Sequence, residues 1–323
     1  MSAYWPHEPT RLAIVAALFA VELALGFALP RLPGRRRARL LAWLLTGGAG
    51  VLVERITADE PSGLRMIALI LGVLYGLKAI VAVESGTRLS PLRWLGFCVL
   101  WFGMRPEPFR KAGGPPQLGV RRLLVHGLVL LLAGAVLMVT AWGVWRASRS
   151  RWLATPPLLV GLSFVLHFGF FNVFAALWRW LGVDCRPLFR APILATGLNE
   201  FWSKRWNLAF SEMTAVAVYR PVAASLGRRA GIFASFVVSG ALHELAISVP
   251  VKAGYGLPMA YFLLHGVLVL TETALARHGR PIDNHPILGR VWTLAALALP
   301  LPLLFHPPFL AGVVWPLIGI NSP

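Results

Sequence analysis

The chain has 323 residues, of which 57% are hydrophobic and only 14% are charged. Soluble domains normally carry about 25% charged residues, so the composition excludes an ordinary soluble protein and favours an integral membrane protein. The net charge of +18 could suggest nucleic acid, but Lys and Arg concentrate in loops between apolar runs, as in membrane proteins, and no DNA- or RNA-binding motif accompanies them.

The first apolar run covers residues 12–29 and ends at Pro30. It has no basic segment before it and no small-residue cleavage site after it, so we expect a spanning helix rather than a signal peptide. Five arginines in residues 31–39 then predict a cytoplasmic loop. Further runs that reach or approach the about 20 residues needed to span a bilayer lie at 40–53, 64–83, 123–145, 157–181, 230–249, 257–276, 291–304 and 309–320.

Residues 54–63 hold three acids and fit the external side, whereas the basic stretch 84–122 should be cytoplasmic. Its apolar piece, 94–104, is too short to span and predicts an interfacial or re-entrant segment. The three arginines of 146–151 conflict with the external position that the span order gives them. We expect about eight or nine spans in one all-α membrane domain over 1–323, because helices satisfy their own backbone hydrogen bonds in lipid.

A histidine and a glutamate interrupt the apolar run around 231–251, as His243-Glu244. A charged residue costs on the order of 2.5–3.5 kcal/mol in hydrocarbon, so such residues usually face a protein interior and act there. A neutral imidazole is a suitable general base, although a histidine can also have the structural role of a hydrogen bond to a neighbouring helix. Ser239 belongs to a group of small residues that permit close helix approach or a substrate path. Glu244 lies on another face of the helix, where pairing with a basic group is our default expectation.

A second cluster lies upstream, at Phe201-Trp202-Ser203-Lys204-Arg205-Trp206-Asn207. An aromatic belt with cations at the membrane interface would explain the Trp, Lys and Arg side chains. It would not explain the amide of Asn207, which prefers a partner or a cavity. Lys204 and Arg205 could instead bind the phosphates of a nucleotide-bearing donor such as coenzyme A. Both interpretations stay open on the residues alone.

Other polar residues within the runs suggest structural roles. His265 and Glu272 share one helix face and could line a tunnel or pair with each other, of which we favour pairing. Glu22 and Lys78 are candidates to neutralise each other, and we expect His126 and His167 to be structural. Cys98 and Cys185 lie in no metal-ligand spacing and fit two buried apolar residues. Histidines and acids also lack metal-binding spacing, so we predict no metal and no cofactor.

The run Gly197-LNEFWSKRWNLAFSEM-Met213, then Tyr219-RP-Pro221, then Phe236-VVSGALHEL-Leu245, resembles the membrane-bound O-acyltransferases, specifically their wax synthase-like branch. The stretch 101–109 is similar to a Pro/Gly/Met-rich segment of that branch. The resemblance implies helices that enclose a central tunnel, with the catalytic core at about 182–278. It also implies transfer of an acyl group from acyl-CoA, as co-substrate, to a hydroxyl. The family histidine would fall on His243 and its paired position on Asn207, where that branch often has histidine.

The resulting hypothesis makes His243 the base for the acceptor hydroxyl, with Asn207 orienting the donor or stabilising an oxyanion. Trp202, Arg205, Trp206 and Lys204 would bind the donor at its entrance, and Ser239 and Glu244 would contact substrate. A long-chain alcohol is the expected acceptor, and a polysaccharide, a glycerolipid or a sterol-like alcohol are alternatives. A proton-coupled transporter using His243, Glu244, His265 and Glu272, and a scaffold subunit, are alternatives of other classes.

The expected partners are acyl-CoA, a lipidic or hydroxyl-bearing acceptor and membrane lipids, but not nucleic acid, and the oligomeric state stays open. Arginine, alanine, glycine and leucine dominate over lysine, a bias typical of GC-rich bacterial genomes. We therefore place the chain in a bacterial inner membrane as a multi-pass protein.

Overall fold

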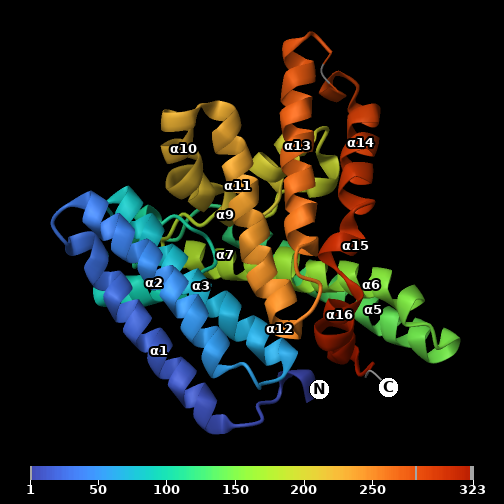
Figure 1. Ribbon diagram of the computed structural model, residues 1–323, viewed down its shortest axis with the longest axis horizontal. Helices are drawn as coiled ribbons and strands as arrows, with labels where there is room; N and C mark the ends of the chain where they lie inside the picture. Colours follow the sequence, from blue (N-terminus) through green and yellow to red (C-terminus); the bar gives the residue numbers. More distant parts are fainter. Residues whose placement is uncertain (1, 281, 321–323) are drawn as a thin grey trace.

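The computed structural model describes residues 2–280 and 282–320, and within these it contains helices and connecting segments without strands. The predicted all-α class of integral membrane protein is confirmed (Figure 1). Among the described residues, seven helical segments are long and apolar enough to cross a membrane: Pro9–Arg31, Ser62–Ser85, Val120–Ser148, Arg151–Trp180, Arg228–Val251, Leu257–Arg277 and Pro286–Leu304.

Two of the nine predicted spans fall outside this set of seven. The run 40–53 lies within α2 (Arg35–Ile56), a helix of spanning length that carries five arginines. The run 309–320 overlaps a shorter apolar segment, Pro307–Ile318. The enclosed central tunnel implied by the family resemblance stays a prediction.

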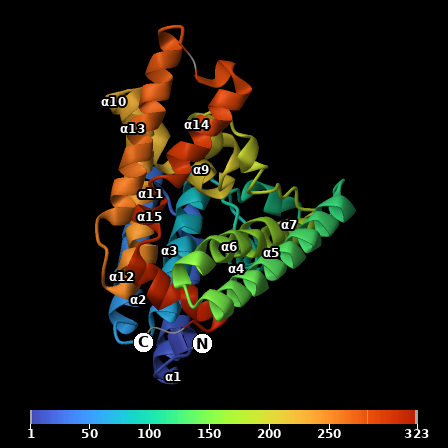
Figure 2. The same ribbon diagram turned by 90° about the vertical axis from the view of Figure 1, so that its right-hand side faces the viewer.

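The helices form three groups. Helices α1 (Pro9–Ala28), α2 and α3 (Ser62–Ser85) lie side by side, with α3 packed against both of the others. Helix α5 (Val120–Ser148) pairs with the segment formed by α6 (Arg151–Ser163), the π-helical η4 (Phe164–Phe170) and α7 (Phe171–Trp180), and this pair slants away from the rest (Figure 2). Helix α11 (Arg228–His243) packs along α13 (Leu257–Arg277), with α14 (Pro286–Ala298) nearby (Figure 1).

Polar contacts of charged side chains hold both ends of α3. At its C-terminal end the Glu84 carboxylate pairs with Arg39 and, at 3.1 Å, with Arg35, both in the first turns of α2. At its N-terminal end the buried Arg65 donates to the Pro250 carbonyl at 2.7 Å. By the positive-inside rule the Arg35 end faces the cytoplasm, so the Arg65 and Pro250 end is the external one.

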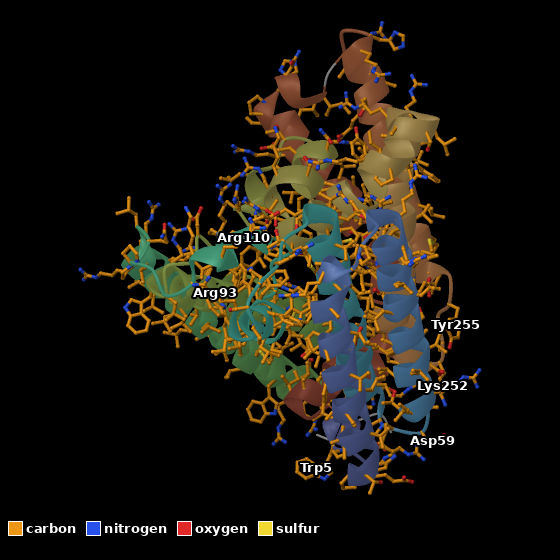
Figure 3. All side chains as sticks on the ribbon, turned by 90° about the vertical axis from the view of Figure 1, so that its left-hand side faces the viewer. Trp5, Asp59, Arg93, Arg110, Lys252 and Tyr255 are labelled. Atoms are coloured by element: carbon orange, nitrogen blue, oxygen red, sulfur yellow. The ribbon has the colours of Figure 1, made fainter. Side chains whose placement is uncertain are left out.

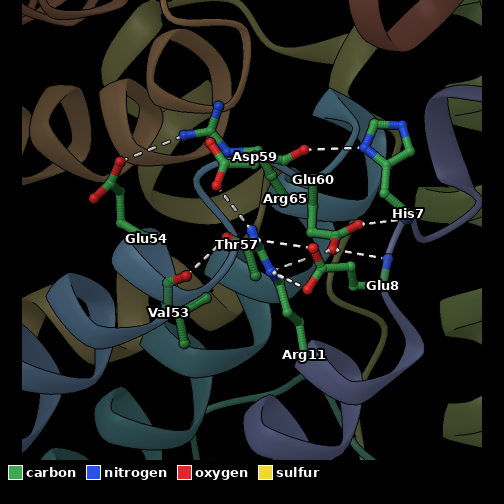
Figure 4. A network of polar contacts seen from close by, with 9 residues as sticks. All are labelled: His7, Glu8, Arg11, Val53, Glu54, Thr57, Asp59, Glu60 and Arg65. Carbon is green, nitrogen blue, oxygen red and sulfur yellow. Dashed lines mark hydrogen bonds and ion pairs between the residues drawn. The ribbon is translucent and has the colours of Figure 1, made fainter.

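The external end also holds the beginning of the chain. Arg11 pairs with Asp59 at 3.0 Å, and the Glu60 carboxylate accepts the His7 backbone N–H at 2.7 Å (Figure 4). Trp5, Asp59, Lys252 and Tyr255 all lie toward this end, away from Arg93 and Arg110 (Figure 3). The acidic loop 54–63 is thus tied to the N-terminal segment.

The aromatic segment at 94–104 folds back into the protein, and Lys78 holds it there. The Lys78 ammonium is fully buried and donates to the carbonyls of Phe97, Trp101 and Gly103 at 2.9, 2.9 and 2.5 Å. Trp94 and Phe97 of α4 (Pro91–Val99) are also buried, which fits a re-entrant rather than an interfacial segment.

The expected pair between Glu22 and Lys78 is wrong. All three donors of the ammonium are used by backbone carbonyls, and both carboxylate oxygens of Glu22 are buried without a hydrogen-bond partner among the described residues. The three carbonyls lie at and after the C-terminal end of α4, where the backbone holds them next to the ammonium. The Glu22 carboxylate of α1 is at the end of a flexible side chain, so ordering it against Lys78 would cost more conformational entropy.

Both polar clusters of the sequence coincide with π-helical turns. One turn is η6 (Phe201–Arg205) and the other is η8 (Glu244–Ser248), which continues α11 toward α12 (Val249–Val251). π-Helical turns insert one extra residue into a helix and are frequent at functional sites. At His243-Glu244 the turn changes the direction in which the following side chains point.

Candidate active site

The His243 imidazole is oriented by its own helix. Its Nδ1 lies 2.7 Å from the carbonyl oxygen of Ser239, one turn earlier. Because a carbonyl can only accept, Nδ1 carries the proton of the neutral ring, and Nε2 keeps its lone pair. No partner is recorded for Nε2 among the described residues, and the side chain is only half-buried. This tautomer is the one that a general base requires.

Helix α13 connects His243 to the upstream cluster. The Phe262 ring lies 4.1 Å from the imidazole of His243 and 5.7 Å from the Trp202 indole, measured between centroids. One turn further along α13, Nδ1 of the buried His265 accepts the indole N–H of Trp202 at 3.1 Å. The two clusters therefore meet on one face of α13, although His243 and Asn207 themselves make only local hydrogen bonds.

Asn207 has a specific backbone role. It lies in the left-handed region with φ 44° and ψ 63°, which asparagine tolerates better than most residues. Its Oδ1 accepts the Phe210 N–H at 3.3 Å and so caps α9 (Leu208–Thr214). Its carboxamide nitrogen makes no hydrogen bond with the described residues. Helix α9 in turn begins where the Leu208 N–H bonds to the Leu188 carbonyl at 2.9 Å.

Of the other residues in this cluster, the tryptophans pack inside the protein and Lys204 lies on the surface. Trp206 stacks on Phe201, with centroids 5.5 Å apart, and packs edge-on against Phe189, so the tryptophans point inward rather than forming a belt. Lys204 is exposed. Arg205 is held by Glu200 at 2.7 Å, and by the carbonyls of residues 190 and 191. Arg205 thus shapes the loop, which leaves Lys204 as the free cation of the motif within the described part of the chain.

Within residues 2–280 and 282–320, Glu244 is bonded to backbone N–H groups and not to a basic side chain, so the expected pairing is wrong. Its Oε1 accepts the backbone N–H groups of Gly256 and Met259 at 2.9 and 3.0 Å and caps the beginning of α13. Free N–H groups at a helix start are a ready partner for a carboxylate. The second oxygen, Oε2, is buried without a recorded partner. The buried Ser239 contributes its carbonyl to His243, and its predicted contact with substrate stays a prediction.

The predicted pair between His265 and Glu272 is also wrong. Glu272 accepts the backbone N–H groups of Leu198 and Asn199 at 2.8 and 3.1 Å and the indole N–H of Trp292 at 2.7 Å. His265 and Glu272 each hold a different part of the loop before Asn207. The spacing of seven residues predicts their common helix face, but it cannot predict their partners, Trp202 and Leu198, which lie 63 and 74 residues away in the chain.

Two cavities lie next to this loop on the cytoplasmic side. A larger one of about 360 Å³ is lined by Ser85, Met104, Arg105, Glu107, Glu212 and Arg220, among others. A narrow one of about 20 Å³ is lined by Arg105, Arg186, Arg190, Leu208 and Glu212, among others. Burial raises the pKa of the Glu212 carboxyl, against the opposing charges of Arg105, Arg190 and Arg186. Neither cavity is lined by His243 or Asn207, so a chamber shared by both side chains stays a prediction.

Sequence comparison agrees with this arrangement, because one family model spans both clusters. Residues 185–264 match the model of the membrane bound O-acyl transferase family. These residues are similar to that family, and the match covers less than half of the chain. The match lies within the segment 182–278 that the resemblance marked as the catalytic core, although that division stays a prediction.

The relatives are named as long-chain-alcohol O-fatty-acyltransferases. The probable long-chain-alcohol O-fatty-acyltransferase 7 of Arabidopsis thaliana is 35% identical over 138 residues, which cover 39% of this chain and 41% of the relative. The probable long-chain-alcohol O-fatty-acyltransferase 2 of the same plant is 36% identical over 42% of each chain. The long-chain-alcohol O-fatty-acyltransferase of Simmondsia chinensis is 33% identical over 30% of each. The chain therefore matches less than half the length of these curated relatives, and the match supports the wax synthase-like branch.

Proposed function

We propose that this chain is a membrane bound O-acyl transferase, and that it moves a fatty acyl group from acyl-CoA to the hydroxyl of a long-chain alcohol. The observation that carries the proposal is the His243 tautomer, with Nδ1–H bonded to the Ser239 carbonyl and Nε2 free, inside the segment that matches the family. The names of the relatives support the alcohol as acceptor over a polysaccharide, a glycerolipid or a sterol-like alcohol.

In the proposed reaction Nε2 of His243 takes the proton of the alcohol as its oxygen bonds to the thioester carbonyl carbon. The carbon–sulfur bond then breaks, and the thiolate of coenzyme A takes the proton back from the imidazolium. The amide nitrogen of Asn207 would donate to the oxyanion between these steps. The products are an ester and free coenzyme A.

The donor would enter from the cytoplasmic side. The larger cavity and the narrow one share Arg105, and together they present Arg186, Arg190 and Arg220. Guanidinium groups bind phosphate oxygens in bidentate geometry, and the narrow cavity reaches Leu208, the residue after Asn207. Lys204, exposed on the same loop, would add a further contact. We propose acyl-CoA as co-substrate on this basis, with no separate cofactor.

The membrane location and the kind of membrane rest on different observations. The apolar helices and the family make this a multi-pass membrane protein. The bacterial cell membrane is a proposal that depends on composition alone, since the compared relatives are plant proteins. The oligomeric state stays open.

The test is product formation by the purified full chain in lipid vesicles. With palmitoyl-CoA and 1-hexadecanol we expect hexadecyl palmitate, identified by mass spectrometry, and stoichiometric release of coenzyme A. His243→Ala should abolish both, whereas His278→Gln, at an exposed site beyond α13, should not. An intact, folded wild-type protein that forms no ester with any alcohol, or a fully active His243→Ala, would refute the proposal.

A further inference from the structure

Two buried polar atoms at the external end have no hydrogen-bond partner. One is Oε2 of Glu244, and the other is Nε2 of His306, a side chain with 0% exposure. Neither has a hydrogen-bond partner among residues 2–280 and 282–320. Buried polar groups are almost always hydrogen-bonded, and leaving one unpaired is costly. Two such atoms near each other suggest a ligand that satisfies both.

The hydrogen-bonding role of each atom follows from its neighbours. Nδ1 of His306 accepts the backbone N–H of Phe309 at 3.3 Å and caps α16 (Pro307–Phe309). Because Nδ1 accepts, the neutral ring carries its proton on Nε2, which is therefore a donor. Oε2 of Glu244, as a carboxylate oxygen, is an acceptor. Burial lowers the pKa of the His306 imidazole, and the charge of Glu244 raises it in part, which agrees with a neutral ring close to the carboxylate.

One glycine turn contacts both side chains. Glu244 binds the N–H of Gly256 through its other oxygen. The edge of the His306 ring that contains Nε2 lies against Gly254, where an added Cβ would come within 2.5 Å of it. Gly254 and Gly256 are two residues apart, in left-handed conformations that favour glycine. The donor and the acceptor thus flank one glycine turn without an ion pair recorded between them.

We infer that Glu244 and His306 form an entry site for the acceptor's hydroxyl, which there donates to Glu244 Oε2 and accepts from His306 Nε2–H before it moves on to Nε2 of His243. A hydroxyl is both a donor and an acceptor, so it satisfies both atoms at once, whereas a carboxylate would leave one of them unpaired and an alkyl chain would leave both. The site follows His243 directly in the chain and lies on the side opposite the arginine-lined cavities. The acceptor would therefore approach the base from the external half while the donor comes from the cytoplasm. This inference rests on the proposed function for the identity of the molecule that carries the hydroxyl.

Each of two variants removes one proposed hydrogen bond to the acceptor's hydroxyl and keeps the helix cap that the wild-type side chain provides. Glu244→Gln retains an oxygen for the N–H groups of Gly256 and Met259 but replaces Oε2 with an amide nitrogen that cannot accept. His306→Ser retains an N-cap hydroxyl for Phe309, since serine is a preferred cap, but removes the Nε2 donor. His278→Gln is the matched control, at an exposed histidine away from the site.

The first measurement is steady-state kinetics with 1-hexadecanol and palmitoyl-CoA varied separately. Each variant should raise the KM for hexadecanol about tenfold or more, the usual effect of losing a hydrogen bond in a buried site, and leave the KM for palmitoyl-CoA within about twofold of the control. Unchanged KM values for hexadecanol in both folded variants would overturn the inference, and would mean that the pair holds only a structural water.

The second measurement needs no turnover. Hexadecanol, but not hexadecane, should raise the Tm of the wild-type protein without acyl-CoA, and this rise should shrink in His306→Ser. Equal stabilisation by hexadecane would count against the site. Hydroxyl-specific stabilisation in a wild-type protein that makes no ester would refute the proposed function and leave the hydroxyl site supported.

Discussion

The indole N–H of Trp202 is bonded to Nδ1 of His265 at 3.1 Å, and this bond joins the loop before Asn207 to the helix that also contacts His243. His265 has 0% exposure, so the bond is made away from water. The catalytic hypothesis depends on this connection, because it fixes the first polar cluster relative to the second.

A double-mutant cycle should measure this bond. His265→Leu leaves the indole N–H unpaired in a buried place and should lower the free energy of unfolding by about 1–3 kcal/mol. Trp202→Phe alone leaves the imidazole unpaired at a similar cost. The double variant should cost less than the sum of the two, measured by thermal or denaturant unfolding in detergent. Strict additivity would mean that the bond adds nothing.

Asn207→Asp separates the structural and chemical roles of Asn207. Aspartate also tolerates the left-handed conformation and keeps the oxygen that caps α9, but it has no amide nitrogen. The Tm should therefore stay near wild type, whereas kcat should fall about 100-fold or more, as on loss of an oxyanion donor. Asn207→Ala should lower both. If Asn207→Asp were stable and fully active, Asn207 would be only a cap.

Lys78→Met tests the buried ammonium. The substitution keeps an unbranched side chain but leaves the carbonyls of Phe97, Trp101 and Gly103 without their donor. We expect a loss of about 1–3 kcal/mol for each carbonyl that finds no other partner. The exposed Lys111→Met is the control.

The same experiment examines Glu22. Since Glu22 is not paired with Lys78, Glu22→Gln should unfold at or above the wild-type temperature. A fall in Tm as large as that of Lys78→Met would instead indicate a Glu22–Lys78 pair.

Glu200 should make the loop before Asn207 sensitive to acid. Burial raises the pKa of its carboxyl, but the Thr196 N–H and the Arg205 guanidinium lower it by more, so the net shift is downward. A carboxylate with a lowered pKa stabilises the fold above its ordinary pKa, and this stabilisation is lost as the pH falls through the folded value. Wild type should therefore lose Tm below about pH 4.5 more steeply than Glu200→Gln. Identical pH profiles of the two proteins would exclude this role.

The sequence predicted the fold class and the two clusters because hydropathy and intramembrane polar residues depend on local composition alone. It could not predict the partners of Glu244, Glu272 and Lys78, which are backbone N–H and carbonyl groups of distant segments. Any residue supplies such groups, so no side-chain type in the sequence points to them. Arg205 and its partner Glu200 are five residues apart, a spacing that does not bring side chains together on an ordinary α-helix, so the pair follows from the π-helical turn and not from the sequence.

Burial of Lys78 has a consequence for biosynthesis. Helix α3 leaves the ribosome before the segment at 91–104 that satisfies its ammonium, and a bare ammonium in hydrocarbon is costly. We expect the membrane integration of α3 to be delayed until that segment has been synthesised, with the helix held at the translocon or tilted so that Lys78 reaches the lipid headgroups. Ribosome-stalled chains ending before residue 91 should then integrate poorly, and Lys78→Met should integrate early in spite of its weaker final fold.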